Sequence, residues 1–129
     1  MERWRRDAKT GQQLHYFSVP GGGIEAGESP RAAAAREVLE ETTIVVRPKW
    51  LLVSQKLPNG DHHRYFLCDY LSGQPTLSPD SEEYHRSTPD NVHLPRWVPI
   101  DELKAIAFHP DYEPIREMIV KWHISHNQP

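Results

Sequence analysis

The clearest structural signal in the chain lies in Ser29-Pro30-Arg31-Ala32-Ala33-Ala34-Ala35-Arg36-Glu37-Val38-Leu39-Glu40-Glu41-Thr42, which predicts an α-helix. Alanine has the highest intrinsic helix propensity, and a run of alanines fills the first turns. Ser29 is a favourable N-cap, and Pro30 suits the first helical position. The helical period predicts a buried stripe made of Ala32, Ala35, Val38, Leu39 and Thr42. We therefore expect this face to pack against the rest of the fold.

Three glutamates share the opposite face of this helix. Glu37, Glu40 and Glu41 fall within an arc of roughly 100°, because residues i, i+3 and i+4 are neighbours on a helix. Only Arg36, four residues before Glu40, offsets their repulsion from within the helix. Converging carboxylates suit a hard cation such as Mg²⁺ or Mn²⁺. A solvated acidic face is the alternative, and it is the commoner role of a glutamate-rich helix.

A glycine-rich loop, Pro20-Gly21-Gly22-Gly23-Ile24-Glu25-Ala26-Gly27-Glu28, leads directly into this helix. Glycines allow the backbone to approach a ligand closely, and the amides of a helix N-terminus favour anions. The triple glycine alone could form an ordinary turn. Joined to the acidic helix at this spacing, it favours a site for phosphate groups beside a cation.

The loop and helix together resemble the Nudix box, G-x5-E-x7-R-E-U-x-E-E-x-G-U, in which U is aliphatic. Gly22 and Glu28 match its first fixed positions, and Arg36-Glu37-Val38-Leu39-Glu40-Glu41-Thr42-Thr43-Ile44 follows at the required spacing. The one departure is Thr43, which stands where the family has the glycine that ends the helix in the left-handed conformation. We expect Thr43 to loosen or redirect the helix exit at a cost of about 1 kcal/mol, without removing a ligand.

The resemblance implies a fold and a reaction. The implied fold class is α/β, a Nudix-type α/β/α sandwich with a mixed β-sheet between helices, and residues 1–129 form a single Nudix domain. The implied reaction is divalent-metal-dependent hydrolysis of the phosphoanhydride bond of a nucleoside diphosphate linked to another group. The implied cofactor is Mg²⁺ or Mn²⁺, and the implied partner is a small nucleotide substrate.

The resemblance also implies roles for individual residues. Glu37, Glu40 and Glu41 would hold the metal, and Arg36 would orient these carboxylates. Gly22 would contact the metal or the phosphates, Gly23 would contact the phosphates, and Glu28 would brace the loop or help to hold a metal. A carboxylate outside the box often completes the site in this family, which points to Glu82 or Glu83 in the polar segment 72–91. The choice of catalytic base between Glu37 and a loop glutamate stays open.

Composition sets limits on other functions. A chain of 129 residues is large enough for one core, and its net charge of −3 argues against a broad nucleic-acid or membrane footprint. There is no apolar run long enough to span a bilayer. The single cysteine, Cys68, excludes an internal disulfide and favours a reducing cytoplasm. Cys68 itself is expected to be a small buried side chain.

The N-terminal region is shorter than the family resemblance implies. Residues 15–19 read as a strand stopped by Pro20, and Arg3-Trp4-Arg5-Arg6 reads as a solvated strand end. Family members usually carry a further strand here, so either the start lies upstream of Met1 or the sheet is short by a strand. Pairing with a second copy as a homodimer would cover the exposed edge.

The remainder alternates strands with two terminal helices. Residues 44–46 form a strand limited by Pro48, and Asn59-Gly60 predicts a hairpin between 50–57 and 64–71, with His62 and His63 in the solvated loop. Residues 92–98 read as a last strand with Trp97 in the core, followed by a helix over 101–107. Asp111 caps a final helix whose packing stripe is Ile115, Met118, Ile119 and Trp122.

A second function from another class is a regulatory module that binds a nucleotide with little or no turnover. Only Thr43 and the short N-terminal region favour it, because the metal carboxylates are all present. The nucleotide itself is not identified, because base and sugar are recognised outside the box. Oxidised nucleoside triphosphates, ADP-ribose, nucleotide sugars and dinucleoside polyphosphates all remain candidates.

Overall fold

A computed structural model describes residues 1–108 and 113–126, and it confirms an α/β fold. The elements run in the order β1 (Glu2–Arg6), β2 (Gln13–Phe17), α1 (Pro30–Thr42), β3 (Val45–Lys56), β4 (His62–Ser72), α2 (Glu82–Arg86), β5 (Asn91–Leu94), the 3₁₀-helix η1 (Ile100–Glu102) and α3 (Glu113–His126). No helix in the described ranges is both long and apolar enough to cross a bilayer.

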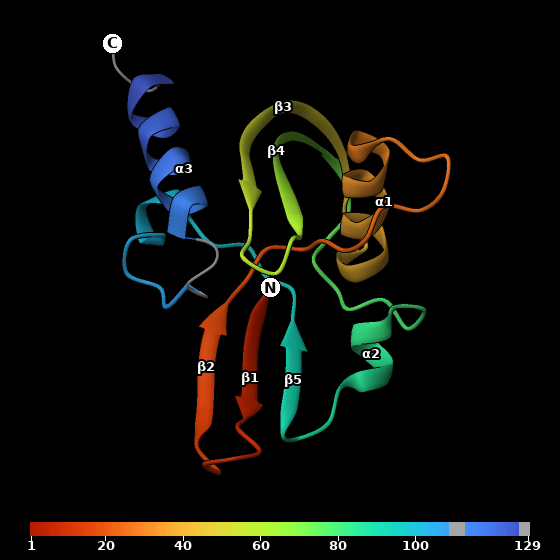
Figure 1. Cartoon of the computed structure of the whole chain (residues 1–129), viewed down its shortest axis with the longest axis vertical. Helices are drawn as coiled ribbons and strands as arrows, with labels where there is room; N and C mark the ends of the chain where they lie inside the picture. Colours follow the sequence, from red (N-terminus) through yellow and green to blue (C-terminus); the bar gives the residue numbers. More distant parts are fainter. Residues whose placement is uncertain (109–112, 127–129) are drawn as a thin grey trace.

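The strands form two antiparallel sheets. One has the order β2-β1-β5, and the other is the β3–β4 hairpin. Figure 1 shows this hairpin between α1 and α3, both of which contact β3, with the three-stranded sheet below. The parallel pairing expected of a mixed sheet is limited, within the described part of the chain, to an isolated bridge between Phe17 and Phe108.

The N-terminal region corrects the sequence interpretation. The stretch Arg3-Trp4-Arg5-Arg6 is a solvated strand end only at Arg5 and Arg6, because it lies in β1, the central strand of the three-stranded sheet, in which Arg3 and Trp4 are half-buried. Glu2 is only 4% exposed there and accepts from Arg96 at 3.2 Å, with His15 Nε2 at 2.8 Å from its other oxygen. These pairs give the buried carboxylate of Glu2 its partners. A strand therefore precedes β2 and forms a hairpin with it.

Helix α1 begins as predicted but packs with a different face. Ser29 Oγ accepts from the Ala32 amide at 3.1 Å, and Pro30 occupies the first turn. The predicted stripe is wrong, because Leu39 is 48% exposed while Ala33 and Glu41 are buried. Residues 33, 37 and 41 follow one another at i+4, and this face turns toward the glycine loop. Of the predicted stripe only Thr42 is fully buried.

The end of α1 also differs from the prediction. Thr43 has φ 62° and ψ 10°, and its amide donates to the Leu39 carbonyl at 3.0 Å. This is the left-handed cap that a glycine would form, so Thr43 does not redirect the helix exit. The surrounding contacts hold a β-branched residue in a conformation that it rarely adopts.

The β3–β4 hairpin is confirmed around Asn59 and Gly60, and Gly60 takes φ +94° at the turn. Two details were wrong. Pro48 does not end the strand, because β3 passes through it with a register shift between Pro48 and Trp50. His62 lies in β4 rather than in the loop, as does His63, which is half-buried.

The C-terminal predictions hold in part. Ile115 is 3% exposed, but Met118 is 37% exposed, so the packing stripe of α3 is only partly buried. Trp97 is 55% exposed and packs edge-on against Tyr70, which contradicts a core role. Two elements are shorter than predicted, because β5 ends at Leu94 and η1 covers only Ile100–Glu102. Cys68 was expected to be buried and is half-buried. Asp111 lies outside the described residues.

The buried position of Ile115 gives a test of the packing. Replacing Ile115 with alanine leaves a cavity, and we expect the free energy of unfolding to fall by about 3 kcal/mol in urea denaturation. Ile124 lies on the same helix but is 50% exposed, so Ile124→Ala is the matched control. Its free energy of unfolding should stay within about 0.5 kcal/mol of the unmodified protein. Equal losses for both variants would mean that α3 does not pack as described.

Candidate active site

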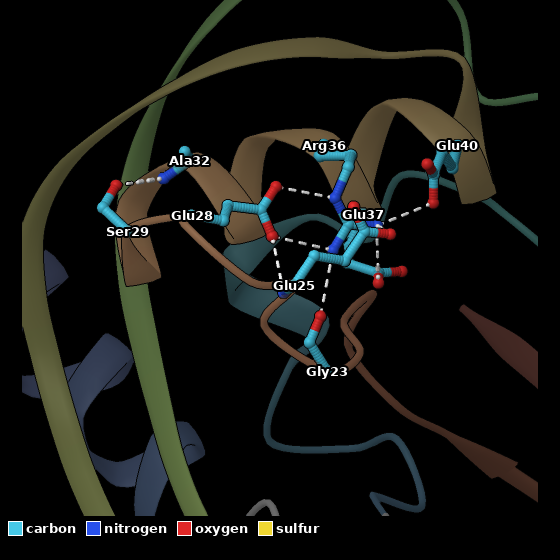
Figure 2. Close-up of polar contacts among 8 residues, drawn as sticks. All are labelled: Gly23, Glu25, Glu28, Ser29, Ala32, Arg36, Glu37 and Glu40. Carbon is cyan, nitrogen blue, oxygen red and sulfur yellow. Dashed lines mark hydrogen bonds and ion pairs between the residues drawn. The ribbon is translucent and has the colours of Figure 1, made fainter.

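A single guanidinium, that of Arg36, ties the glycine loop to helix α1. Its Nε and Nη2 donate to the two oxygens of Glu28 at 2.8 and 3.0 Å, and Nη2 also donates to the Gly23 carbonyl at 2.9 Å. Its Nη1 donates to Glu37 and to Glu40, each at 3.0 Å (Figure 2). An arginine has five N–H donors, and these contacts use them all. Arg36 therefore fixes carboxylates from both the loop and the helix.

The loop folds so that Glu28 can reach Arg36. The Glu28 amide donates to the Glu25 carbonyl at 3.1 Å, and the Glu25 amide donates back to Glu28 Oε1 at 3.1 Å. Gly27 adopts φ +78° inside this turn, a conformation that glycine tolerates without strain. Its charged hydrogen bonds with Arg36 lower the pKa of Glu28. Glu28 is thus an ionised brace between loop and helix.

Gly22 is required for space rather than for an unusual φ angle. A Cβ at this position would lie 2.6 Å from Glu37 Cδ and 2.8 Å from Glu37 Oε2. Such distances are shorter than real contacts, so a side chain here would displace the Glu37 carboxylate. The spacing between the first glycine of the box and Glu37 therefore reflects direct packing of backbone against carboxylate.

Glu41 is the buried carboxylate of the site, with 5% of its surface exposed. It accepts from the Gly21 amide at 3.0 Å and shares a hydrogen bond with the Glu83 side chain. Burial, and then the charge of Glu83, raise the pKa of Glu41 to about 9. No arginine or lysine in the described ranges forms an ion pair with it. The charged form of Glu41 therefore lacks a side-chain cation to balance it.

Glu37 and Glu40 differ from Glu41 in their surroundings. Burial raises the pKa of Glu37, and the hydrogen bond and charge of Arg36 act in the opposite direction. Glu40 lies nearer solvent, with about half of its side chain exposed. Both carboxylates are held by Arg36, whereas Glu41 faces Gly21 and Glu83. Arg36 thus holds Glu37 and Glu40, while Glu41 forms a carboxylate pair with Glu83 of α2.

The predicted site residues other than Glu28 lie around one hollow of about 400 Å³. Its wall comes from the glycine loop, the acidic face of α1 and the start of α2: Gly21, Gly22, Gly23, Glu25, Arg36, Glu37, Glu40, Glu41, Asp80, Ser81, Glu82 and Glu83. Of the two glutamates singled out in segment 72–91, Glu83 meets Glu41, while Glu82 is 77% exposed and pairs with Arg86. Sequence reasoning missed Asp80 and Ser81, which no motif marks.

The donors fit a hard divalent cation in chemistry, although they do not converge as they stand. Among the described residues, no three His, Cys, Asp or Glu side chains are arranged to hold a metal ion. Arg36 holds Glu37 and Glu40 by hydrogen bonds, whereas Glu41 accepts from the Gly21 amide. The donors available are nonetheless all oxygens, and the Glu41–Glu83 pair has no arginine or lysine between its charges. A hard cation would supply the missing charge.

A larger hollow of about 550 Å³ adjoins the acidic one. Gly21, Gly22 and Glu37 line both, so these residues form a shared wall. The larger hollow is otherwise bounded mainly by apolar side chains of α1, β4 and α3, with His62 and His63 at β4. A bound molecule could therefore reach from an acidic region into an apolar one.

Comparison with known proteins gives a consistent picture. The NUDIX domain family matches residues 2–120. An ADP-ribose pyrophosphatase of Methanocaldococcus jannaschii is 27% identical over 111 residues, which cover 82% of this chain and 58% of that protein. The chain therefore spans little more than half the length of that relative.

Solved structures agree on the fold. A chain from a study of MutT from Aliivibrio salmonicida and Vibrio cholerae has a TM-score of 0.62 at 22% identity, covering 94% of this chain and 84% of that one. A MutT protein from Methanosarcina mazei has a TM-score of 0.59 at 20% identity, with coverage of 98% and 85%. The ORF135 protein of E. coli has a TM-score of 0.62 at 20% identity, with coverage of 99% and 84%.

The contacts of Arg36 predict a stability effect. Arg36→Ala leaves the carboxylates of Glu28 and Glu37 without their arginine partner. Both side chains are only 15% exposed, so water cannot fully replace the lost ion pairs. We expect the free energy of unfolding to fall by about 2 kcal/mol, measured by urea denaturation. The control is Arg86→Ala, because the ion pair of Arg86 with Glu82 is highly exposed and should contribute less than about 0.5 kcal/mol. Similar losses for both variants would contradict the bracing role of Arg36.

Proposed function

This chain belongs to the NUDIX domain family, and from that membership we propose that it hydrolyses a phosphoanhydride bond. The substrate class proposed is a nucleoside diphosphate linked to another group, so the protein acts as a nucleotide pyrophosphohydrolase. The proposed domain is single and spans residues 1–129. The family generally uses divalent metals, and we propose Mg²⁺ or Mn²⁺ here.

The observation that carries this proposal is the buried carboxylate of Glu41, which faces Glu83 beside the glycine loop without an arginine or lysine partner in the described chain. A buried charge of this kind is unfavourable unless something compensates it. Glu37, Glu40, Glu41 and Glu83 are the proposed ligands. When bound, a divalent cation neutralises phosphate oxygens and activates water for attack on phosphorus.

Arg36 has a positioning role in this proposal. All of its N–H donors are engaged by Glu28, Glu37, Glu40 and the Gly23 carbonyl, so none is left for a phosphate. Its function is to hold the loop and the helix glutamates in register. Glu28, which takes two of these bonds, braces the loop and is a less suitable ligand than Glu41.

The glycine loop is the proposed cradle for the phosphates. Gly22 lies against Glu37 with no room for a side chain, so a phosphate near Gly22 or Gly23 would lie next to the metal carboxylates. Glu83 is a better candidate than Glu82 for the additional ligand or base, since Glu82 points to Arg86 in solvent. Glu37 is the other candidate for the base, and its pairing with Arg36 limits its freedom to accept a proton.

The adjoining apolar hollow suits the part of the substrate beyond the phosphates. ADP-ribose is the first compound to test, because the relative from M. jannaschii is an ADP-ribose pyrophosphatase. Nucleoside triphosphates, nucleotide sugars and dinucleoside polyphosphates complete the set.

Cytoplasmic location and a homodimer stay predictions, and analytical ultracentrifugation would test the second.

A hydrolysis screen tests the proposed function directly. The protein is incubated with each of these compounds, with Mg²⁺, with Mn²⁺ or with a chelator, and nucleoside monophosphate release is measured. We expect metal-dependent release from at least one compound. Binding of a nucleotide without release would instead favour the regulatory module considered above.

Individual glutamates can then be ranked by substitution. Glu41→Gln keeps the size of the side chain and removes its charge, so we expect kcat/KM to fall by about 10³-fold or more through lost metal binding. Glu83→Gln should lose about tenfold to a hundredfold. Glu82→Gln is the matched control, since Glu82 is 77% exposed and paired with Arg86, and it should stay within about twofold. Full activity in Glu41→Gln would exclude the proposed metal site.

Metal binding also predicts a gain in stability. A cation among the carboxylates binds only the folded chain, so a metal concentration 100-fold above Kd should add about 2.7 kcal/mol to the free energy of unfolding. Thermal unfolding with MgCl₂ or MnCl₂, against NaCl at equal ionic strength, measures this effect. The gain should disappear in Glu41→Gln and on addition of a chelator. An equal gain from NaCl would show only screening of like charges.

A further inference from the structure

Thr43 has a property that the box helix does not require. It is the one non-glycine residue with positive φ in the described part of the chain, at φ 62°. Glycine would adopt this conformation freely, whereas a β-branched side chain is strained in it. This strained residue caps α1, the helix that carries the site glutamates. The contacts of the Thr43 side chain therefore indicate what its hydroxyl contributes.

The hydroxyl of Thr43 is bound to a distant segment. Its Oγ1 donates to the Gln74 carbonyl at 2.8 Å, and the neighbouring Thr42 carbonyl accepts from the Thr76 amide at 2.9 Å. Gly73 fits closely against the same place, since a Cβ there would lie 2.6 Å from the Thr43 carbonyl oxygen. Residues 73–76 therefore lie across the end of α1. Glycine at position 43 would lack the side-chain bond.

The segment held in this way leads to Glu83. Five residues after Thr76, Ser81 is 4% exposed and caps α2, accepting from the Tyr84 amide at 3.1 Å. Its hydroxyl donates to the Ser78 carbonyl at 2.7 Å, which closes the turn before the helix. Glu83 stands in the first turn of α2 and meets Glu41. The segment is thus bonded to the end of α1 at Gln74 and Thr76, and it is buried at Ser81.

We infer that Thr43 is a positioning residue: its hydroxyl holds the segment 74–83 so that Glu83 stays against Glu41. The inference rests on the proposed function for the importance of Glu83, but not for the contact itself. Thr43 then has two opposed effects on the molecule. Its backbone conformation lowers stability, while its hydroxyl orders the segment that carries a site carboxylate.

Three substitutions separate these effects. Thr43→Val keeps the branched shape and the strain but removes the hydroxyl, Thr43→Ser keeps the hydroxyl, and Thr43→Gly removes both hydroxyl and strain. Hydrogen exchange of amides 74–83, in the protein without added metal, measures order in the segment. We expect protection to fall by about fivefold in Thr43→Val and in Thr43→Gly. Thr43→Ser should stay within about twofold of the unmodified protein.

Activity and stability should then diverge. We expect kcat to fall by about tenfold in Thr43→Val and Thr43→Gly, because displacement of the Glu83 carboxylate slows the reaction of bound substrate. KM should change by less than about twofold. Thr43→Gly should nevertheless melt about 3 °C or more above Thr43→Val. Equal losses of activity in two variants of unequal stability are a pattern that general weakening of the fold does not produce.

A double-substitution cycle tests whether Thr43 acts through Glu83. In the Glu83→Gln background, Thr43→Val should have less than about a twofold further effect on kcat. Additive losses would overturn the inference, and so would unchanged exchange of amides 74–83 in Thr43→Val. If the unmodified protein hydrolyses none of the compounds, the proposed function fails, while the exchange measurement still decides whether Thr43 holds the segment.

Discussion

The site depends on one guanidinium with no donor to spare. Arg36 engages Glu28, Glu37, Glu40 and the Gly23 carbonyl, so loop and helix are fixed relative to each other by charged hydrogen bonds. The same arrangement uses every N–H donor of Arg36, while the buried carboxylate of Glu41 accepts from the Gly21 amide, faces Glu83 and interacts with the charge of the Met1 amino group. Because the guanidinium of Arg36 binds Glu28, Glu37 and Glu40, it has no N–H donor left to bind the carboxylate of Glu41. The proposed cation site rests on this division between the carboxylates held by Arg36 and the Glu41–Glu83 pair.

Local chemistry was enough to predict α1 with its cap at Ser29 and the hairpin turn at Asn59 and Gly60. It was also enough to mark Glu41 and the glycine loop. The buried face of α1 was not predictable from periodicity, because the polar residues Glu37 and Glu41 face inward and Leu39 faces solvent. Site carboxylates reverse the usual pattern of polar outside and apolar inside.

Features that depend on contacts between residues far apart in the chain could not be predicted from local sequence patterns. The strand at Glu2–Arg6 is central only because β5 arrives from residues 91–94 to pair with it. Glu83 could be named as one of two candidates, but it is the contact of Glu83 with Glu41, and the pairing of Glu82 with Arg86 in solvent, that distinguish the two. The left-handed Thr43 was expected to bend the chain away, and instead the segment at Gly73 holds it in place.

The pairing of β1 with β5 has a consequence for how the polypeptide acquires its structure. Glu2 faces Leu94 across the ladder, so during synthesis β1 cannot pair with β5 until the chain has been made as far as residues 91–94. Closing so long a loop is entropically demanding and slows the search for the native state. Until β5 has been made, a β1–β2 hairpin would have an unpaired edge along β1, and such an edge favours association with other chains.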